Sequence, residues 1–132
     1  VQLMGTWCPN CLDESIYLNE WLQANVGRGV RVIAIDFERT TDSAKVWSNI
    51  NRFKDRLYID YPVVFGGNSN RDTASAKLPM ISKIMAYPTS LIIDKHGHVR
   101  KIHTGFSGPA TGEDFLIHKN EFELFVEELL AE

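Results

Sequence analysis

The feature that most constrains this chain is a pair of cysteines, Cys8 and Cys11, separated only by Pro9 and Asn10. They are the only cysteines among 132 residues. A disulfide across so short a span closes almost no loop, so it restrains little of the unfolded chain. Secreted domains held together by disulfides carry several pairs at wide spacings. We therefore expect this pair to serve chemistry rather than cross-linking.

The residues around the pair predict a strand before it and a helix after it. Residues 1–4 have the apolar character of a strand, and a helix is expected over about 9–25. Proline suits the first helical turn because its missing N–H would have no partner there. Cys8 then falls at or beside the helix N-cap, at the exposed start of the helix, where free N–H groups and the helix dipole stabilise a thiolate. Such positions lower a cysteine pKa from ~8.5 to between ~3.5 and ~7.5.

Two thiols at this spacing favour redox exchange. Cys11 lies one helical turn after Cys8, where it can attack a disulfide formed at Cys8. A zinc site would need two more ligands, and the histidines (His96, His98, His103 and His118) all lie far downstream. Covalent haem attachment would place a histidine directly after Cys11, where Leu12 stands. Metal binding and inert burial remain the alternatives to exchange.

The rest of the chain predicts alternating strands and helices. Further strands are expected at residues 30–37, 61–65, 89–93 and 99–104, and further helices at 41–57, 72–85 and 113–130. A strand–helix–strand order implies parallel strands with a right-handed crossover, and the late hairpin adds antiparallel strands. We therefore expect one α/β domain over residues 1–132, with a mixed central sheet flanked by helices.

The composition argues against a nucleic-acid partner and against a membrane-spanning segment. Lys and Arg number 14 against 17 Asp and Glu, without a basic stripe, so no nucleic-acid partner is expected. The longest apolar runs are only a few residues, too short to span a membrane. Because the chain opens directly in a strand, we expect a domain that is incomplete at its N-terminus, with any signal peptide or membrane anchor upstream. We also expect a monomer.

Three segments together resemble the thioredoxin superfamily, and more narrowly its extracytoplasmic TlpA/ResA branch in bacteria. They are Trp-Cys-Pro-Asn-Cys at residues 7–11, Tyr-Pro-Thr at 87–89 before an apolar strand, and the Asp-to-Gly turn at 94–97. The resemblance covers nearly the whole chain, and the helix and strand expected at about 40–66 match the central insertion of that branch. It implies a thioredoxin-like fold with a mixed central sheet, lacking the strands that usually precede residue 1.

The resemblance also implies an activity. The chain would be an enzyme, a protein thiol–disulfide oxidoreductase, whose only redox group is the Cys8–Cys11 disulfide and which needs no other cofactor. Its partners would be protein disulfides and a membrane or periplasmic electron donor, and its place the periplasm. Reduction of apocytochromes before haem attachment and general reductive repair are two roles that the family suggests.

Roles carried over from the family fall on specific residues. Cys8 would be the attacking thiol, Cys11 the resolving thiol, and Glu14 an acid that handles the proton of Cys11. Glu14 also suits the helix start without any function, because negative charge is favourable there. Gln2 stands where thioredoxin has a buried aspartate, and an amide cannot ionise. A proton relay from that strand is therefore not expected.

Substrate contacts are expected around the pair. Pro88 would be a cis-proline that faces the cysteines, and Trp7, Pro9, Asn10 and Tyr87 would form the rim against which a substrate lies. No metal site is part of this interpretation. The alternative is a binding module on the same fold, a metallochaperone that holds a soft ion such as Cu(I) between the two thiolates and a histidine.

Overall fold

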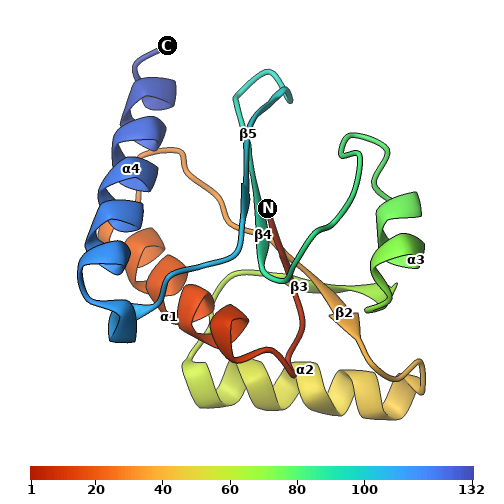
Figure 1. Ribbon diagram of the computed structural model, residues 1–132. Helices are drawn as coiled ribbons and strands as arrows, with labels where there is room; N and C mark the ends of the chain where they lie inside the picture. The colour runs from red at the N-terminus through yellow and green to blue at the C-terminus, as the bar shows by residue number, and fades with distance from the viewer.

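The computed structural model describes residues 1–132 and contains one five-stranded sheet in the order β3-β2-β1-β4-β5 (Figure 1). The strands are β1 (Gln2–Met4), β2 (Ala34–Glu38), β3 (Val63–Asn68), β4 (Thr89–Ile93) and β5 (Val99–Thr104). The helices are α1 (Pro9–Ala24), α2 (Ser43–Leu57), α3 (Arg71–Ala76) and α4 (Glu113–Leu130), with a short 3-10 turn, η1 (Pro109–Thr111).

The central strand β1 has one parallel and one antiparallel neighbour. It runs parallel to β2, with Leu3 opposite Ile35, and antiparallel to β4, with Leu3 opposite Thr89. β3 extends the parallel side and β5 the antiparallel side. All three residues of β1 are buried, as expected for a strand covered on both faces. The predicted α/β class with a mixed sheet is confirmed.

Helices cover both faces of the sheet. α1 and α4 lie on one side and α3 on the other (Figure 1). The larger core cluster brings Met4 of β1 and both cysteines against the apolar stripe of α2, which includes Ile50 and Phe53. The smaller cluster packs Leu3 and Phe37 against the segment that holds α3. The start of α1 is therefore held in the larger core, at the end of the central strand.

Two predicted elements are shorter in the structure than expected. The strand expected from residue 30 begins at Ala34, the first residue of β2 that pairs with both β1, at Gln2, and β3, at Val63. The helix expected over 72–85 covers only Arg71–Ala76, and Pro79, which has no N–H to donate, lies in the turns that follow.

The predicted loop at residues 66–70 is in part strand. β3 continues through Gly66 and Gly67 to Asn68, with Gly67 opposite Phe37 of β2. A Cβ on Gly66 would lie only 2.8 Å from the ring of Phe37, so the glycine makes room for that ring. The helices of the chain include none long and apolar enough to cross a membrane.

Candidate active site

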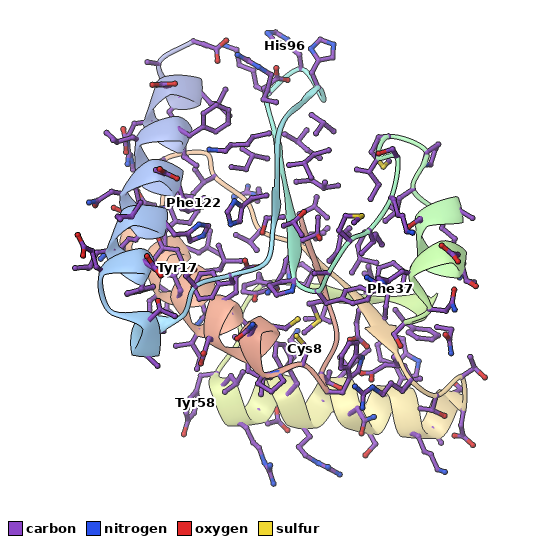
Figure 2. All side chains as sticks on the ribbon, viewed as in Figure 1. Cys8, Tyr17, Phe37, Tyr58, His96 and Phe122 are labelled. Carbon is purple, nitrogen blue, oxygen red and sulfur yellow. The ribbon has the colours of Figure 1, made fainter.

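Cys8 is the N-cap of α1. Its backbone is extended, and its sulfur accepts a hydrogen bond from the backbone N–H of Cys11 at 3.3 Å. The backbone N–H of Cys8 donates to the carbonyl of Gly5, and this turn ties the helix start to the end of β1. Pro9 occupies the first helical turn, as predicted. Figure 2 shows Cys8 at the start of α1, between the sheet and α2.

The two thiols are electrostatically unequal. The side-chain hydrogen bond from Cys11 lowers the pKa of Cys8 to about 7, helped by the N–H groups of Cys11 and Asn10 and by the charge of Arg39, against the effect of burial. The same hydrogen bond with Cys8, together with burial, raises the pKa of Cys11 far above its ordinary value. Cys8 therefore ionises first, and Cys11 keeps its proton while Cys8 is a thiolate.

The expectation that Cys8 lies at an exposed helix start was wrong. Only 5% of Cys8 is exposed, and Cys11 is wholly buried. The carbonyl of Tyr87, 79 residues further along the chain, accepts a hydrogen bond from the Cys8 thiol at 3.5 Å. The ring of Trp7 meets that of Tyr87 edge to face, with centroids 5.7 Å apart. The loop before β4 thus lies against the cysteine pair.

That loop contains the predicted cis peptide bond, between Tyr87 and Pro88. Pro88 is buried, and its carbonyl accepts a hydrogen bond from the N–H of Gly105 at 2.7 Å. The hydroxyl of Tyr87 donates to the carbonyl of Ser69 at 3.1 Å. These contacts fasten the loop to the residue just after β5 and to the segment after β3, so its position against Cys8 is fixed from two directions.

The predicted rim residues do gather around Cys8. Pro9 and Asn10 are exposed, whereas Trp7 and Tyr87 are half-buried. The indole N–H of Trp7 donates to the carbonyl of Phe37 at 2.9 Å. Gly5 makes this contact feasible, because a Cβ there would clash with the indole nitrogen. The indole is held in a defined position beside the cysteine that follows it.

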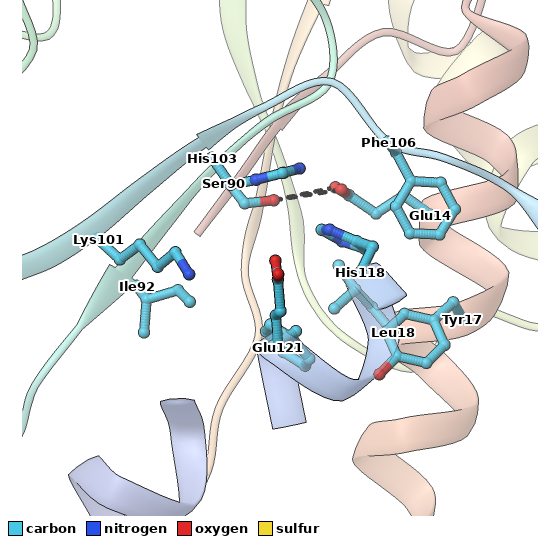
Figure 3. Close-up of a pocket in the computed structure, with 11 residues that line it drawn as sticks. Glu14, Tyr17, Leu18, Ser90, Ile92, Lys101, His103, Phe106, His118 and Glu121 are labelled. Carbon is cyan, nitrogen blue, oxygen red and sulfur yellow. Dashed lines mark hydrogen bonds between the residues drawn. The ribbon is translucent and has the colours of Figure 1, made fainter. Parts of the chain in front are cut away.

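Glu14 is buried on α1, three residues after Cys11. It is 2% exposed, and burial raises its pKa to about 7, against the hydrogen bonds that it accepts from Ser90 at 3.2 and 3.3 Å. Its charge is one of the causes that raise the pKa of Cys11. Glu14 also lines a cavity of about 20 Å³, enough for one water molecule. Figure 3 shows the bond to Ser90, with His103 and His118 beside it.

A buried polar network supports Cys11 from the side of β1. The amide of Gln2 donates to Ser15 at 3.0 Å and accepts from the hydroxyl of Tyr61 at 3.1 Å. Ser15 in turn donates to the carbonyl of Cys11 at 2.7 Å. Gln2 was singled out from the sequence, but the contributions of Ser15 and Tyr61 to this network were not predicted. The spacing of four residues between Cys11 and Ser15, one helical turn, was the available signal.

A second buried acid, Asp36 on β2, was also missed. It is wholly buried, and neither carboxylate oxygen has a hydrogen-bond partner. Burial raises its pKa to about 8, and the neighbouring Glu38 acts in the same sense. Asp36 pairs with Met4 across the sheet, next to the turn that leads to Cys8. An acid between the apolar residues Ile35 and Phe37 was the sequence signal for it.

The four histidines divide into two pairs. His96 and His98 lie in the exposed turn between β4 and β5. His103 and His118 are half-buried, with ring centroids 4.3 Å apart. No group of three or more His, Cys, Asp or Glu side chains is arranged to hold a metal ion.

The sequence matches the model of the AhpC/TSA family over residues 2–102. The match covers well over half of the chain, so this chain belongs to the AhpC/TSA family. The predicted resemblance to ResA is confirmed by relatives that carry that name.

The chain is 31% identical over 114 residues to the thiol-disulfide oxidoreductase ResA of Geobacillus thermodenitrificans. That match covers 86% of this chain and 56% of the relative. This chain is also 28% identical to the thiol:disulfide interchange protein DsbE of Vibrio cholerae, over 80% of this chain and 48% of that relative. The chain thus spans about half the length of the curated relatives that it matches.

A crystal structure of a DsbE-type thiol:disulfide interchange protein from Chlorobium tepidum superposes on this fold with a TM-score of 0.68. The match covers 98% of this chain and 77% of that one, at 18% sequence identity. The predicted thioredoxin-like fold is thereby confirmed.

Proposed function

We propose that this chain is a thiol–disulfide oxidoreductase that exchanges disulfides with protein substrates through Cys8 and Cys11. The observation that carries the proposal is the unequal pair, an N-cap thiol with a pKa of about 7 in contact with a buried thiol of much higher pKa. The family membership and the names of the relatives support the same activity.

In the reducing direction, the Cys8 thiolate attacks one sulfur of a substrate disulfide. The substrate S–S bond breaks, its second sulfur leaves as a thiolate and takes up a proton, and a mixed disulfide joins Cys8 to the substrate. Cys11 then loses its proton and attacks the sulfur of Cys8, which releases the substrate as a dithiol. Two electrons pass from the cysteine pair to the substrate, and the enzyme is left with a Cys8–Cys11 disulfide.

The second step needs a base, because Cys11 is buried and its pKa is raised. Glu14 is the residue that we assign to this proton. Its pKa of about 7 lets it exist as a carboxylate near neutral pH and still accept a proton. The rim of Trp7, Pro9, Asn10 and Tyr87 would hold the substrate polypeptide while the bonds exchange.

The setting of the reaction follows from the resemblance to ResA-type proteins. We place the enzyme outside the cytoplasm, where it acts mainly as a reductase and is itself reduced by a membrane or periplasmic donor of electrons. It acts as a monomer and uses the cysteine pair without a further cofactor. These features together support a role in keeping protein thiols reduced outside the cytoplasm.

The proposal is tested by equilibrating the protein in dithiothreitol redox buffers and trapping free thiols for mass spectrometry. We expect one reversible two-electron transition between two free thiols and a Cys8–Cys11 disulfide, and reduction of a disulfide-bonded peptide by the reduced protein but not by Cys8→Ala. Thiols that stay free under oxidation and fail to reduce the peptide would overturn the proposal. Tight 1:1 binding of Cu(I) in that case would instead support the metallochaperone.

A further inference from the structure

A hollow of about 490 Å³ opens beside Trp7, the residue that precedes Cys8. One wall is formed by Trp7 and by Arg39, which follows β2, and the other by a face of α2 that includes Asn49, Arg52 and Arg56. These three α2 residues are spaced by three and four positions, so they share one side of the helix. We call this hollow the arginine groove, after Arg39, Arg52 and Arg56.

The three guanidinium groups of the groove are free to bind an anion. All three arginines are exposed, and none of them takes part in an ion pair, although Arg28 and Arg100 elsewhere both do. The one acid that lines the groove is Glu38, which is 2% exposed and accepts a hydrogen bond from the hydroxyl of Thr6. The chain carries a net charge of −3, so this local excess of positive charge runs against the composition.

The groove is joined to the reacting sulfur through Trp7. The guanidinium carbon of Arg39 lies 4.3 Å from the centre of the Trp7 ring, a cation–π contact. The charge of Arg39 is also among the causes that lower the pKa of Cys8. A polypeptide whose disulfide lies at Cys8 therefore has this positive groove beside it as it crosses Trp7.

We infer that the preferred substrates are protein disulfides flanked by an acidic segment, and that this segment docks in the arginine groove. The inference rests on the proposed function, because the occupant is part of the polypeptide that exchanges disulfides at Cys8. Carboxylates of the segment would pair with Arg52 and Arg56, and the charge of the groove would steer the encounter. The groove takes no part in the electron and proton transfers of the exchange. It determines which substrates bind preferentially.

The test uses two synthetic peptides that share the same disulfide loop but differ in the flanking residues, which are Asp and Glu in one and Lys in the other. We expect the acidic peptide to be reduced with the higher kcat/KM, chiefly through a lower KM. This preference should shrink as the salt concentration rises from ~0.02 to ~0.3 M, because exposed charges are screened. Each of the variants Arg52→Gln and Arg56→Gln should lower the preference about 2- to 5-fold at low salt.

Arg31→Gln is the matched control. Arg31 is also exposed and without an ion pair, but it lies outside the groove, in the segment before β2. The variant Arg31→Gln removes the same charge as the groove variants and should leave the preference for the acidic peptide unchanged. Equal kcat/KM for the two peptides, or a preference that Arg31→Gln lowers as much as the groove variants do, would overturn this inference alone. Failure to reduce either peptide would instead overturn the proposed function.

Discussion

The backbone N–H of Cys11 donates a hydrogen bond to the sulfur of Cys8 across 3.3 Å. The contact exists because Cys8 is the N-cap of α1 and Cys11 lies three residues into the helix. A donor at this place favours a negative charge on Cys8, and a negative charge on Cys8 disfavours ionisation of Cys11. The difference in pKa between the two thiols thus follows from where the helix begins.

Glu14→Gln should change the pH dependence of the resolving step. The pKa of Glu14 is about 7, so the fraction able to accept the proton of Cys11 rises through neutral pH. We expect the release of substrate from a preformed mixed disulfide to slow and to lose its inflection near pH 7, as followed by stopped-flow mixing. Glu20→Gln, an exposed acid on the same helix, is the control and should keep the inflection. An unchanged profile in Glu14→Gln would leave this residue as a charge near the helix start.

Asp36→Asn should flatten the dependence of stability on pH. The folded-state pKa of Asp36 is about 8, above its value in the unfolded chain, so the folded state binds more protons between about pH 4 and pH 8. The stability of the natural protein should therefore fall as pH rises through this window. Asp36→Asn should remove on the order of 1–3 kcal/mol of that fall, measured by urea unfolding at several pH values. Glu14 contributes in the same direction, so some slope should remain. Parallel curves for the two proteins would contradict this account of Asp36.

Gln2→Leu should lower stability and raise the pKa of Glu14. The side-chain amide of Gln2 satisfies the buried groups of Ser15 and Tyr61, and leucine would leave both with one partner fewer. We expect the free energy of unfolding to fall by about 1–3 kcal/mol. The inflection of the pH profile should move to higher pH, because a hydrogen bond from Gln2 is one of the causes that lower the pKa of Glu14. Unchanged stability would contradict this account of the buried network.

The parts of the site that were predictable are those encoded locally. Strand, turn and helix follow one another around Cys8, so the N-cap position of Cys8 and the place of Cys11 one turn into the helix were predicted from one short segment. The loop at Tyr87 was foreseen only through its resemblance to a known family. That it would bury Cys8 depends on a contact across 79 residues, which no local pattern encodes. Asp36 was missed for a related reason, because its burial is set by the strands and helices around β2.

Selective alkylation should separate the two thiols. In the reduced protein, iodoacetamide should modify Cys8 before Cys11, with a rate that rises around pH 7, because the thiolate is the reactive form. Peptide mapping by mass spectrometry identifies the modified residue. Because Cys8 is only 5% exposed, the maximal rate should be below that of a free thiol, while the midpoint should remain near 7. A midpoint near the free-thiol value of ~8.5 would contradict the electrostatic account.

Trapping of the mixed disulfide tests the assignment of the two roles most directly. Each of the variants Cys11→Ala and Cys8→Ala is mixed with the same disulfide-bonded peptide, and covalent adducts are measured by non-reducing mass spectrometry. Cys11→Ala should accumulate an adduct through Cys8, because the attacking thiolate remains and the resolving thiol is gone. Cys8→Ala should accumulate little, because its remaining thiol is buried and its pKa is raised. An adduct that accumulates on Cys8→Ala and not on Cys11→Ala would show that the roles are reversed.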